Sequence, residues 1–210
     1  MGPSLLNWCG RPWELGDPIP GGPVIPRYEP MLATSWRAPF SDDEWFFEPK
    51  WDGYRLIVSF DGVATSLRSR AGSDLTSRYP ELAQARFDRP SVFDGEVVGF
   101  GENGQPSFEQ LQQRSGHYSA AVAASYPVAF IVFDFLWDGT ALVDSPMSER
   151  RHRLGDVDLP DGFILSTGVI GAGRELWGTV LAEDLEGMVA KRLASRYVPG
   201  VRSPDWRKIP

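Results

Sequence analysis

The sequence contains little of what marks secreted, membrane-bound or zinc-binding proteins. Its single cysteine, Cys9, cannot form an internal disulfide or a cysteine-based zinc site, so the cytoplasm is the expected compartment. No apolar run approaches the roughly 18 residues that a membrane-spanning helix needs, and the N-terminal segment is too interrupted by proline and charge to be a signal peptide. These absences predict a globular protein with no membrane partner.

An excess of positive charge is also missing. The net charge is −7 and the isoelectric point is near 4.9, which argues against a protein that grips nucleic acid through bulk positive charge. Any contact with nucleic acid must therefore come from a local patch. Arg150, Arg151 and Arg153 cluster in the sequence, but such a run most often forms only the solvated face of a helix, and we expect that here.

Lysine is scarce, with three lysines against 18 arginines. Arginine therefore supplies the charge wherever charge alone is needed, and Lys50, Lys191 and Lys208 are expected to do something that arginine cannot. A guanidinium stays protonated at any working pH, whereas a buried ammonium can lose its proton and attack an electrophile. All three lysines are candidate functional residues before any motif is considered.

What is present predicts two segments and an α+β fold. Residues 1–26 carry six prolines and five glycines without a sustained period, which predicts an extended arm. The hydrophobic fraction of 42% is ample for a core, which we place in residues 27–210. Hairpins mixed with helices, without a regular βαβ rhythm, predict antiparallel β-sheets flanked by helices.

The expected elements follow one another along residues 54–209. A hairpin is predicted from strands 54–60 and 63–69, joined by the two-residue turn Asp61-Gly62. The other expected strands are residues 91–100, 127–137, 163–170, 187–192 and 205–209. The expected helices are residues 80–87, 107–114, 145–154 and 172–185.

One stretch, residues 46–55 with the sequence FFEPKWDGYR, places Lys50 at the end of an apolar run and immediately before the hairpin. It contains the pattern KxDGxR. Five further segments follow in order: SRAG at 69–72, FDGE at 93–96, FDFL at 133–136, EGMVAK at 186–191 and WRK at 206–208.

These six segments, in this order, resemble the motifs of the covalent nucleotidyltransferases, the superfamily of ATP-dependent DNA ligases, RNA ligases and mRNA capping enzymes. The resemblance covers about residues 30–210 and is most similar to bacterial ATP-dependent DNA ligases of the end-joining type. It implies a nucleotidyltransferase (ATP-grasp-like) adenylation domain that uses ATP and Mg²⁺. AMP would pass from Lys50 to the 5′-phosphate of nicked or broken duplex DNA, and a 3′-hydroxyl would then displace it.

The resemblance implies a role for each candidate residue around the lysine. Lys50 would be the nucleophile, and Asp52 would orient its ammonium or the magnesium shell. Glu48 would lie beside the adenine and contact it mostly through the main chain. Arg55 and Arg70 can fork onto ribose or phosphate oxygens, although without the motif either would be an ordinary surface arginine.

Later motifs supply the remaining candidates. Glu96 is two residues from Asp94 on a strand, so both share a face, and the resemblance implies that Glu96 holds a ribose hydroxyl or a metal-bound water. Phe133 has a flat face on which adenine can stack, although a phenylalanine in so apolar a run is more often part of the core. Lys191 and Lys208 would neutralise the α-phosphate as pyrophosphate leaves.

Glu186 is the expected magnesium ligand, since Mg²⁺ takes carboxylate oxygen and keeps several waters. Glu186 and Lys191 are five residues apart, so an unbroken strand would point them to opposite faces. We therefore expect Gly187 to bend the chain between them.

Two features depart from the family pattern. Ligases usually carry a second lysine two residues after Lys208, a position that Pro210 occupies here. They also continue into an OB-fold domain, which we do not find. We expect a shortened protein, a stand-alone core that relies on a separate OB-fold domain or end-joining proteins, or a relic with reduced activity. Each predicts ATP binding, adenylation that is slow at best, and weak affinity for nicked DNA.

Three other functions stay open. An RNA ligase or a guanylate-transferring capping enzyme shares the same motifs, and labelling with ATP against GTP, then RNA against DNA nicks, separates them. A non-catalytic module that binds nucleotide or DNA ends is favoured by the short C-terminal end. The retention of Lys50 argues against it, because binding alone would tolerate arginine. An enzyme that adenylates a small carboxylate is the third.

Overall fold

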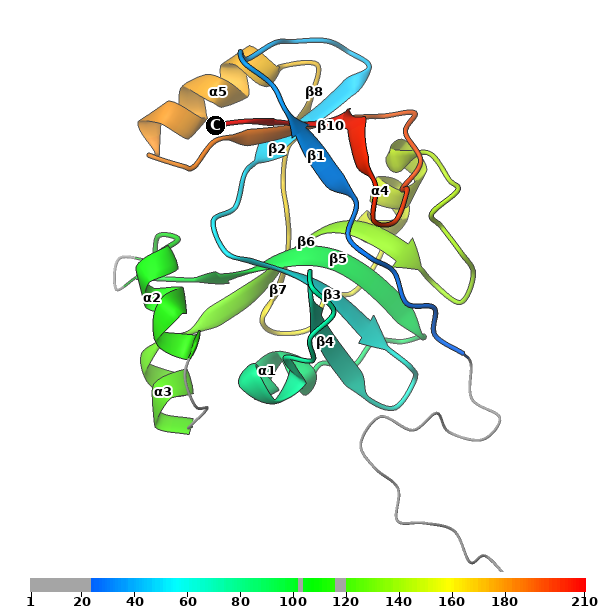
Figure 1. The fold of residues 1–210 in the computed structure, drawn as a ribbon, viewed down its shortest axis with the longest axis vertical. Helices are drawn as coiled ribbons and strands as arrows, with labels where there is room; N and C mark the ends of the chain where they lie inside the picture. Colours follow the sequence, from blue (N-terminus) through cyan, green and yellow to red (C-terminus); the bar gives the residue numbers. More distant parts are fainter. Residues whose placement is uncertain (1–23, 102–103, 116–119) are drawn as a thin grey trace, which may run out of the picture.

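Two five-stranded sheets lie one above the other in the computed structural model, which describes residues 24–101, 104–115 and 120–210 (Figure 1). The first sheet has the order β1 (Leu32–Ser35), β10 (Arg202–Ile209), β9 (Met188–Arg192), β2 (Trp45–Pro49), β8 (Val169–Ile170). The second has the order β4 (Thr65–Ser69), β3 (Tyr54–Phe60), β5 (Ser91–Gly99), β6 (Val128–Trp137), β7 (Phe163–Leu165). The predicted N-terminal arm falls almost wholly outside the described residues.

Five α-helices and two short 3-10 helices of the described residues flank these sheets. They are α1 (Pro80–Ala83), α2 (Phe108–Gln112), α3 (Ala120–Ser125), α4 (Met147–Gly155) and α5 (Gly173–Ala182), with 3-10 turns at Thr76–Arg78 and Gln113–Ser115. Most strand pairs are antiparallel, and the two parallel pairs, β1 with β10 and β6 with β7, lie at sheet edges. The predicted α+β class with antiparallel sheets flanked by helices is therefore confirmed.

The hairpin turn is longer than predicted. Phe60 pairs with Thr65, so four residues connect β3 and β4, and the two-residue turn was wrong. The Asp61 carboxylate accepts hydrogen bonds of 2.8 Å from the amides of Val63 and Ala64. An aspartate that binds the backbone two residues ahead forms its own turn, which competes with the tighter hairpin.

The predicted strand at residues 163–170 divides into β7 and β8, which belong to different sheets. The chain crosses from the second sheet to the first between them. At Gly168 it passes so close to β2 that a Cβ atom would lie 2.2 Å from the carbonyl oxygen of Phe47. The predicted helix at 80–87 is also shorter, ending at Ala83.

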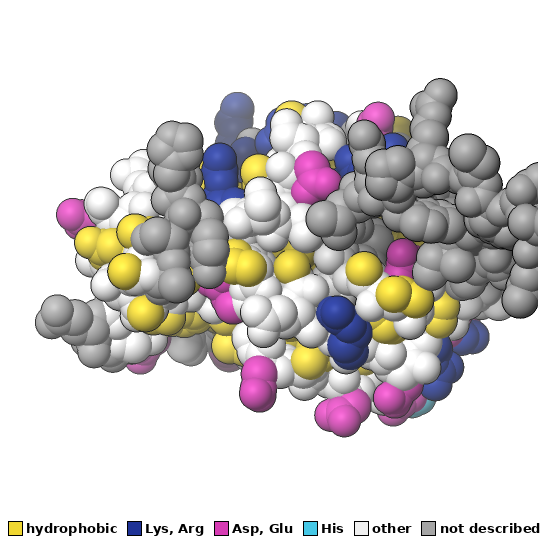
Figure 2. Space-filling model, turned by 90° about the horizontal axis from the view of Figure 1, so that it is seen from below, with side chains coloured by type: hydrophobic (Ala, Val, Ile, Leu, Met, Phe, Trp, Pro, Cys, Tyr) yellow, Lys and Arg dark blue, Asp and Glu magenta, His cyan; other side chains and the backbone are white. Residues whose placement is uncertain are grey.

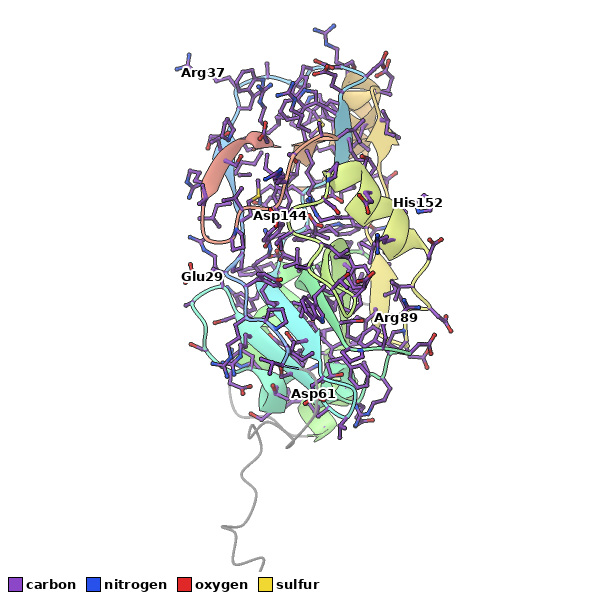
Figure 3. All side chains as sticks on the ribbon, turned by 90° about the vertical axis from the view of Figure 1, so that its right-hand side faces the viewer. Glu29, Arg37, Asp61, Arg89, Asp144 and His152 are labelled. Carbon is purple, nitrogen blue, oxygen red and sulfur yellow. The ribbon has the colours of Figure 1, made fainter. Side chains whose placement is uncertain are left out.

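The buried hydrophobic side chains of the described residues form four clusters, the smallest of them at Val98, Ala129 and Ile131. One cluster lies between the second sheet and its helices, with Leu82 of α1 and Leu111 of α2 packed against the sheet. Another lies between the first sheet and α5, where Val180 contributes. A third, which includes Phe133 and Trp206, joins the two sheets and leaves side chains densely packed between them (Figure 3).

The arginine run of α4 does not form a solvated face as expected. Arg150 is fully buried and binds Asp134 of β6, with 2.7 Å from Nε to Oδ1 and 2.9 Å from Nη2 to Oδ2. Arg151 is partly buried, and only Arg153 pairs near the surface, with Asp138 and Glu149. The expectation was wrong because α4 packs on β6 and turns the first arginine inward.

On the face shown in Figure 2, Lys and Arg side chains are scattered among acidic and hydrophobic ones. None of the helices in the described part of the chain combines the length and apolar character required to cross a bilayer.

Candidate active site

Strand alternation turns several predicted residues toward the space between the sheets. On β9 and β10, Lys191 pairs across from Trp206, whose side chain belongs to the cluster joining the sheets. Lys208 is two residues from Trp206 and Glu48 is two residues from Phe46, the cross-strand partner of Lys191. Since side chains repeat every second residue of a strand, Glu48, Lys191 and Lys208 share the inner face of the first sheet.

Lys50 follows β2 directly and lies at the mouth of this region. Its amide donates a 2.8 Å hydrogen bond to the carbonyl of Gly187, and its ammonium forms an ion pair with Glu186. The two side chains are 24% and 40% exposed. Such an ion pair places a cationic amine where solvent and a ligand can reach it.

Gly187 makes this contact possible. Its φ is +148°, in the region that favours glycine, and a Cβ there would lie 2.3 Å from the carbonyl oxygen of Ile209. The bend predicted at Gly187 is therefore confirmed. It lets Glu186 reach Lys50 while Lys191, on the regular strand that follows, points inward.

The charge of Glu186 acts on two other carboxylates near Lys50, those of Asp52 and Glu96. Burial raises the pKa of Asp52, Glu186 raises it further, and Lys50 opposes both. Burial also raises the pKa of Glu96 to about 7, with Arg55 and Lys50 opposing and Asp94 and Glu186 adding to it. Glu96 is therefore a carboxyl that can change its charge near neutral pH.

The raised pKa of Glu96 predicts a pH-dependent stability. The folded state holds the Glu96 proton up to about pH 7, whereas the unfolded state releases it near 4.5, so folded Glu96 binds more protons between these values. Stability should fall as pH rises through this window, by up to about 3 kcal/mol at about 1.4 kcal/mol per pKa unit. Urea unfolding of the wild type and Glu96→Gln at pH 5 and pH 7.5 measures it. A stability difference between the two that stays constant with pH would contradict the prediction.

Arg55 is held by a buried network rather than left free. Its Nε and Nη2 donate to the two carboxylate oxygens of Asp94 at 2.5 and 2.6 Å, and Nη2 also donates to the carbonyl of Met31. The Tyr197 hydroxyl donates to Asp94 at 2.5 Å and accepts from the Met31 amide at 2.9 Å. Sequence reasoning missed Tyr197, because it lies in a loop outside every motif. It joins the loop before β10 to the second sheet.

Removing the Tyr197 hydroxyl should destabilise this junction. Tyr197→Phe leaves the Met31 amide without a partner in a buried region and leaves Asp94 Oδ2 with only its hydrogen bond from Arg55, at an expected cost of about 1–3 kcal/mol. Urea unfolding at pH 7 measures the loss. Tyr28→Phe, at a partly buried tyrosine, is the matched control and should change stability by less than about 0.5 kcal/mol. Equal effects in both variants would contradict the role of the hydroxyl.

Glu48 and Lys191 form a buried ion pair on the inner face of the first sheet. Their Oε1 and Nζ atoms are 2.5 Å apart, and the side chains are 3% and 1% exposed. Burial lowers the pKa of Lys191, while Glu48 and Asp134 oppose the shift. The Glu48 side chain is therefore already paired with Lys191. The predicted contact with adenine would be made by the main chain of the same residue.

Phe133 lies at a β-bulge of β6. The register of β5 and β6 shifts between Asp94 and Gly95, which makes Phe133 the extra residue of β6. Its ring centroid is 4.4 Å from the Arg55 guanidinium carbon and 4.2 Å from Lys191 Nζ. Bulges often redirect a side chain beside a functional site. Phe133 is also 7% exposed and part of the core, so the core interpretation of the sequence is confirmed and stacking on adenine stays a prediction.

Arg70 and Lys208 differ in their position relative to this region. Arg70 follows β4 with an exposed side chain, and its amide donates to the carbonyl of Arg55. Lys208 is partly buried on β10, between β1 and β9. The structure therefore places Lys208 on the inner face with Glu48 and Lys191, whereas Arg70 lies at the margin with an exposed side chain.

A magnesium site made wholly of protein is not found in the part of the chain that the structure describes, where no group of three His, Cys, Asp or Glu side chains could hold a metal. Magnesium ordinarily binds one or two carboxylates together with substrate phosphates and water. The Glu186 carboxylate, which is 40% exposed beside Lys50, is suited to bind magnesium in this way, as one of few protein ligands.

Known proteins are similar to this chain in sequence and in fold. The family model described as ATP dependent DNA ligase domain matches residues 30–209. The multifunctional non-homologous end joining protein LigD of Mycolicibacterium smegmatis is 39% identical over 186 residues, 86% of this chain and 23% of that protein. The SPbeta prophage-derived DNA ligase-like protein LigB of Bacillus subtilis is 32% identical over 183 residues, 86% of this chain and 66% of that protein.

A solved structure is also similar to this chain. Mycobacterial DNA ligase D complexed with ATP and MES superposes with a TM-score of 0.75 at 37% identity, over 86% of this chain and 59% of that chain. The chain thus spans less than two thirds of these relatives. The resemblance that the six motifs indicated is confirmed, because the family model covers all of them. The chain therefore belongs to the family of the ATP-dependent DNA ligase domain.

Proposed function

We propose that this chain is the adenylating core of a DNA ligase. Lys50 Nζ attacks the α-phosphate of ATP, an N–P bond forms, and pyrophosphate leaves with the electrons of the broken P–O bond. The AMP then moves to the 5′-phosphate of a nick or break in duplex DNA, and the 3′-hydroxyl displaces it. The observation that carries the proposal is the position of Lys50, beside Glu186 and at the mouth of the inner faces that hold Arg55, Glu96 and Lys191.

The side chains around Lys50 suit its two charge states. The Glu186 carboxylate, in contact with the ammonium, is placed to take the proton that Lys50 must lose before attack. Asp52 holds the orientation of the amine from the other side of the same loop. Glu186 would also supply the carboxylate for Mg²⁺, which provides positive charge beside the phosphates when bound.

The remaining residues serve the nucleotide. Lys191 and Lys208 supply positive charge to the α-phosphate, where charge develops as pyrophosphate leaves. Arg55 and Arg70 face ribose or phosphate oxygens, and Glu96 accepts from a ribose hydroxyl or a metal-bound water. Phe133 stacks on the base, and Glu48 contacts it.

The substrate and partners follow from the family and its relatives. We place nicked or broken duplex DNA as the acceptor, since the LigD relative is named for non-homologous end joining. The acidic net charge of −7 supports weak DNA binding by this chain alone, with an OB-fold domain or end-joining proteins as partners. The single cysteine supports a cytoplasmic location.

Intact mass after incubation with ATP and Mg²⁺ tests the proposal. The wild type should gain one AMP and Lys50→Ala should gain none. Adding nicked duplex DNA should then remove the AMP and yield an adenylated or sealed strand. Labelling by GTP in preference to ATP, or transfer only to nicked RNA, would replace the proposal with a capping enzyme or an RNA ligase. Bound ATP without any adduct would contradict the adenylating role.

A further inference from the structure

A closed ring of hydrogen bonds fixes the Arg55 guanidinium along one edge. Arg55 donates from Nε and Nη2 to the two oxygens of Asp94, and Nη2 also donates to the carbonyl of Met31. The Tyr197 hydroxyl completes the ring, because it donates to Asp94 Oδ2 and accepts from the Met31 amide. Within the part of the chain that the structure describes, Nη1 is the guanidinium nitrogen of Arg55 that makes no hydrogen bond. It is therefore the atom left to meet a ligand.

The other edge of the guanidinium lies beside residues of the proposed nucleotide site. Arg55 is directly across from Glu96 in the pairing of β3 with β5, and its charge acts to lower the pKa of that carboxyl. The guanidinium carbon lies 4.4 Å from the centre of the Phe133 ring. The Arg55 side chain is 20% exposed, whereas Asp94 is 0% exposed. Arg55 thus has a buried edge against Asp94 and remains accessible next to Glu96 and Phe133.

The Asp94 carboxylate decides which kind of acceptor suits Arg55. Two short hydrogen bonds from one guanidinium to one carboxylate form a bidentate pair, in which the two charges largely cancel. Arg55 then offers a directed donor rather than a net positive charge, so a neutral oxygen is its matching acceptor. Of the two acceptors that the sequence left open, the ribose hydroxyl fits this donor better than the phosphate.

Tyr197 is itself fixed in place by the loop that carries it. Its amide donates to the carbonyl of Val143 at 2.9 Å, and the carbonyl of Ser195 accepts from the buried Arg150 at 3.0 Å. The Tyr197 side chain is also buried, at 2% exposed. The last torsion of an aspartate side chain is only broadly restricted, so its carboxylate can turn. Because the Tyr197 hydroxyl binds Oδ2 of Asp94, it opposes that rotation.

We infer that Tyr197 is a positioning residue for adenylation: it holds the Asp94 carboxylate, which in turn aims Arg55 Nη1 at a hydroxyl oxygen of the nucleotide ribose. This inference rests on the proposed function and gives the role to a residue outside all six motifs. A Tyr197 that only stabilises the fold would lower stability when changed without altering how the sugar is recognised. The two roles can therefore be separated by experiment.

Rates with sugar analogues test the inference. Single-turnover adenylation is measured with ATP, 2′-deoxy-ATP and 3′-deoxy-ATP for the wild type, Tyr197→Phe and Thr65→Val. Thr65→Val is the matched control, because it removes another buried hydrogen bond, 2.6 Å from Oγ1 to the carbonyl of Ala85, at the hairpin end of β4. In the wild type one deoxy analogue should react at least about tenfold more slowly than ATP, since a hydrogen bond from a charged donor corresponds to about 10–100-fold. That ratio should fall to within about threefold in Tyr197→Phe and persist in Thr65→Val, even where both variants lose the same stability.

The outcomes separate this inference from the proposed function. If Tyr197→Phe loses stability but keeps the wild-type ratio, Tyr197 only stabilises the fold and the inference is wrong. If both deoxy analogues react as fast as ATP in the wild type, the inference is also wrong and the adenylating role stands. If the wild type forms no adduct, the proposed function fails, and the affinities of the three nucleotides for the wild type and Tyr197→Phe, measured by calorimetry, decide the inference. The same loss of the ratio then supports it, and an unchanged ratio overturns it.

A loss of folding in Tyr197→Phe would not block this test. All three proteins are then measured in trimethylamine N-oxide, an osmolyte that favours the folded state because it is excluded from the protein surface. The same ratios are expected there.

Discussion

Lys50→Arg should abolish adenylation, by more than about 10³-fold, while the variant stays folded. The arginine can still pair with Glu186, so the positive charge and its contact at the mouth of the site remain. A guanidinium stays protonated at working pH and has no free electron pair to attack the α-phosphate. Intact mass after incubation with ATP and Mg²⁺ measures the loss, and urea unfolding should place the stability within about 0.5 kcal/mol of wild type.

Lys208→Arg is the matched control for this prediction. It makes the same exchange at another rare lysine, whose proposed role of supplying charge to the phosphate needs no proton transfer. It should therefore keep most of the adenylation, which sets aside for Lys208 the expectation, drawn from the scarcity of lysine, that arginine cannot replace it. A full-rate adduct in Lys50→Arg would show that another side chain is the nucleophile, and equal loss in both variants would show that lysine is needed at both positions for a shared reason.

Arg150→Met should cost about 3–5 kcal/mol of folding free energy, a large share of the roughly 5–15 kcal/mol that holds a domain together. The change leaves the Asp134 carboxylate, 2% exposed, without its two hydrogen bonds from Arg150. It also removes the donor shared by the carbonyls of Ser145 and Ser195. The cost arises mainly from the unpaired buried charge rather than from the lost attraction.

Urea unfolding at pH 7 measures this effect, and a second variant identifies its cause. Arg150→Met combined with Asp134→Leu removes both charges and should recover at least half of the loss, because no carboxylate then stays unpaired. Arg153→Met, whose side chain is 43% exposed in its ion pairs, should change stability by less than about 1 kcal/mol. If Arg153→Met costs as much as Arg150→Met, burial of the pair is not what makes it important.

The sequence predicted the central strands β3, β5 and β6 of the second sheet well because they carry their own pattern, but it did not predict β2, an inner strand of the first sheet. The apolar run of β6 and the β-branched and aromatic residues of β3 are local signals for a strand, and both strands appear where expected. The prediction failed at β1, an edge strand of the first sheet, for a physical reason. β1 pairs with β10, about 170 residues away, and no local sequence pattern indicates such a partner. Residues 163–170 look like one strand, although their two halves join different sheets.

The candidate site also contains both residues that the sequence identified and residues that it did not. The six motifs and the scarcity of lysine identified Lys50, Glu186 and Lys191, and the glycine at 187 was expected for its bend. Tyr197 was not identified, since it lies outside every motif and its partners, Asp94 and Met31, come from distant segments.

The sequence by itself determined which residues are candidates for the chemistry, because an attacking amine and its neighbouring charges depend on side-chain identity and short spacing. It also determined the fold class, since strand periods and turn residues act locally. Only the tertiary structure decided which charges are paired: Arg55 with Asp94, Lys191 with Glu48, and Arg150 with Asp134. Such pairs form between strands and helices far apart in the chain, and the burial that sets their pKa values exists only once the two sheets have packed together.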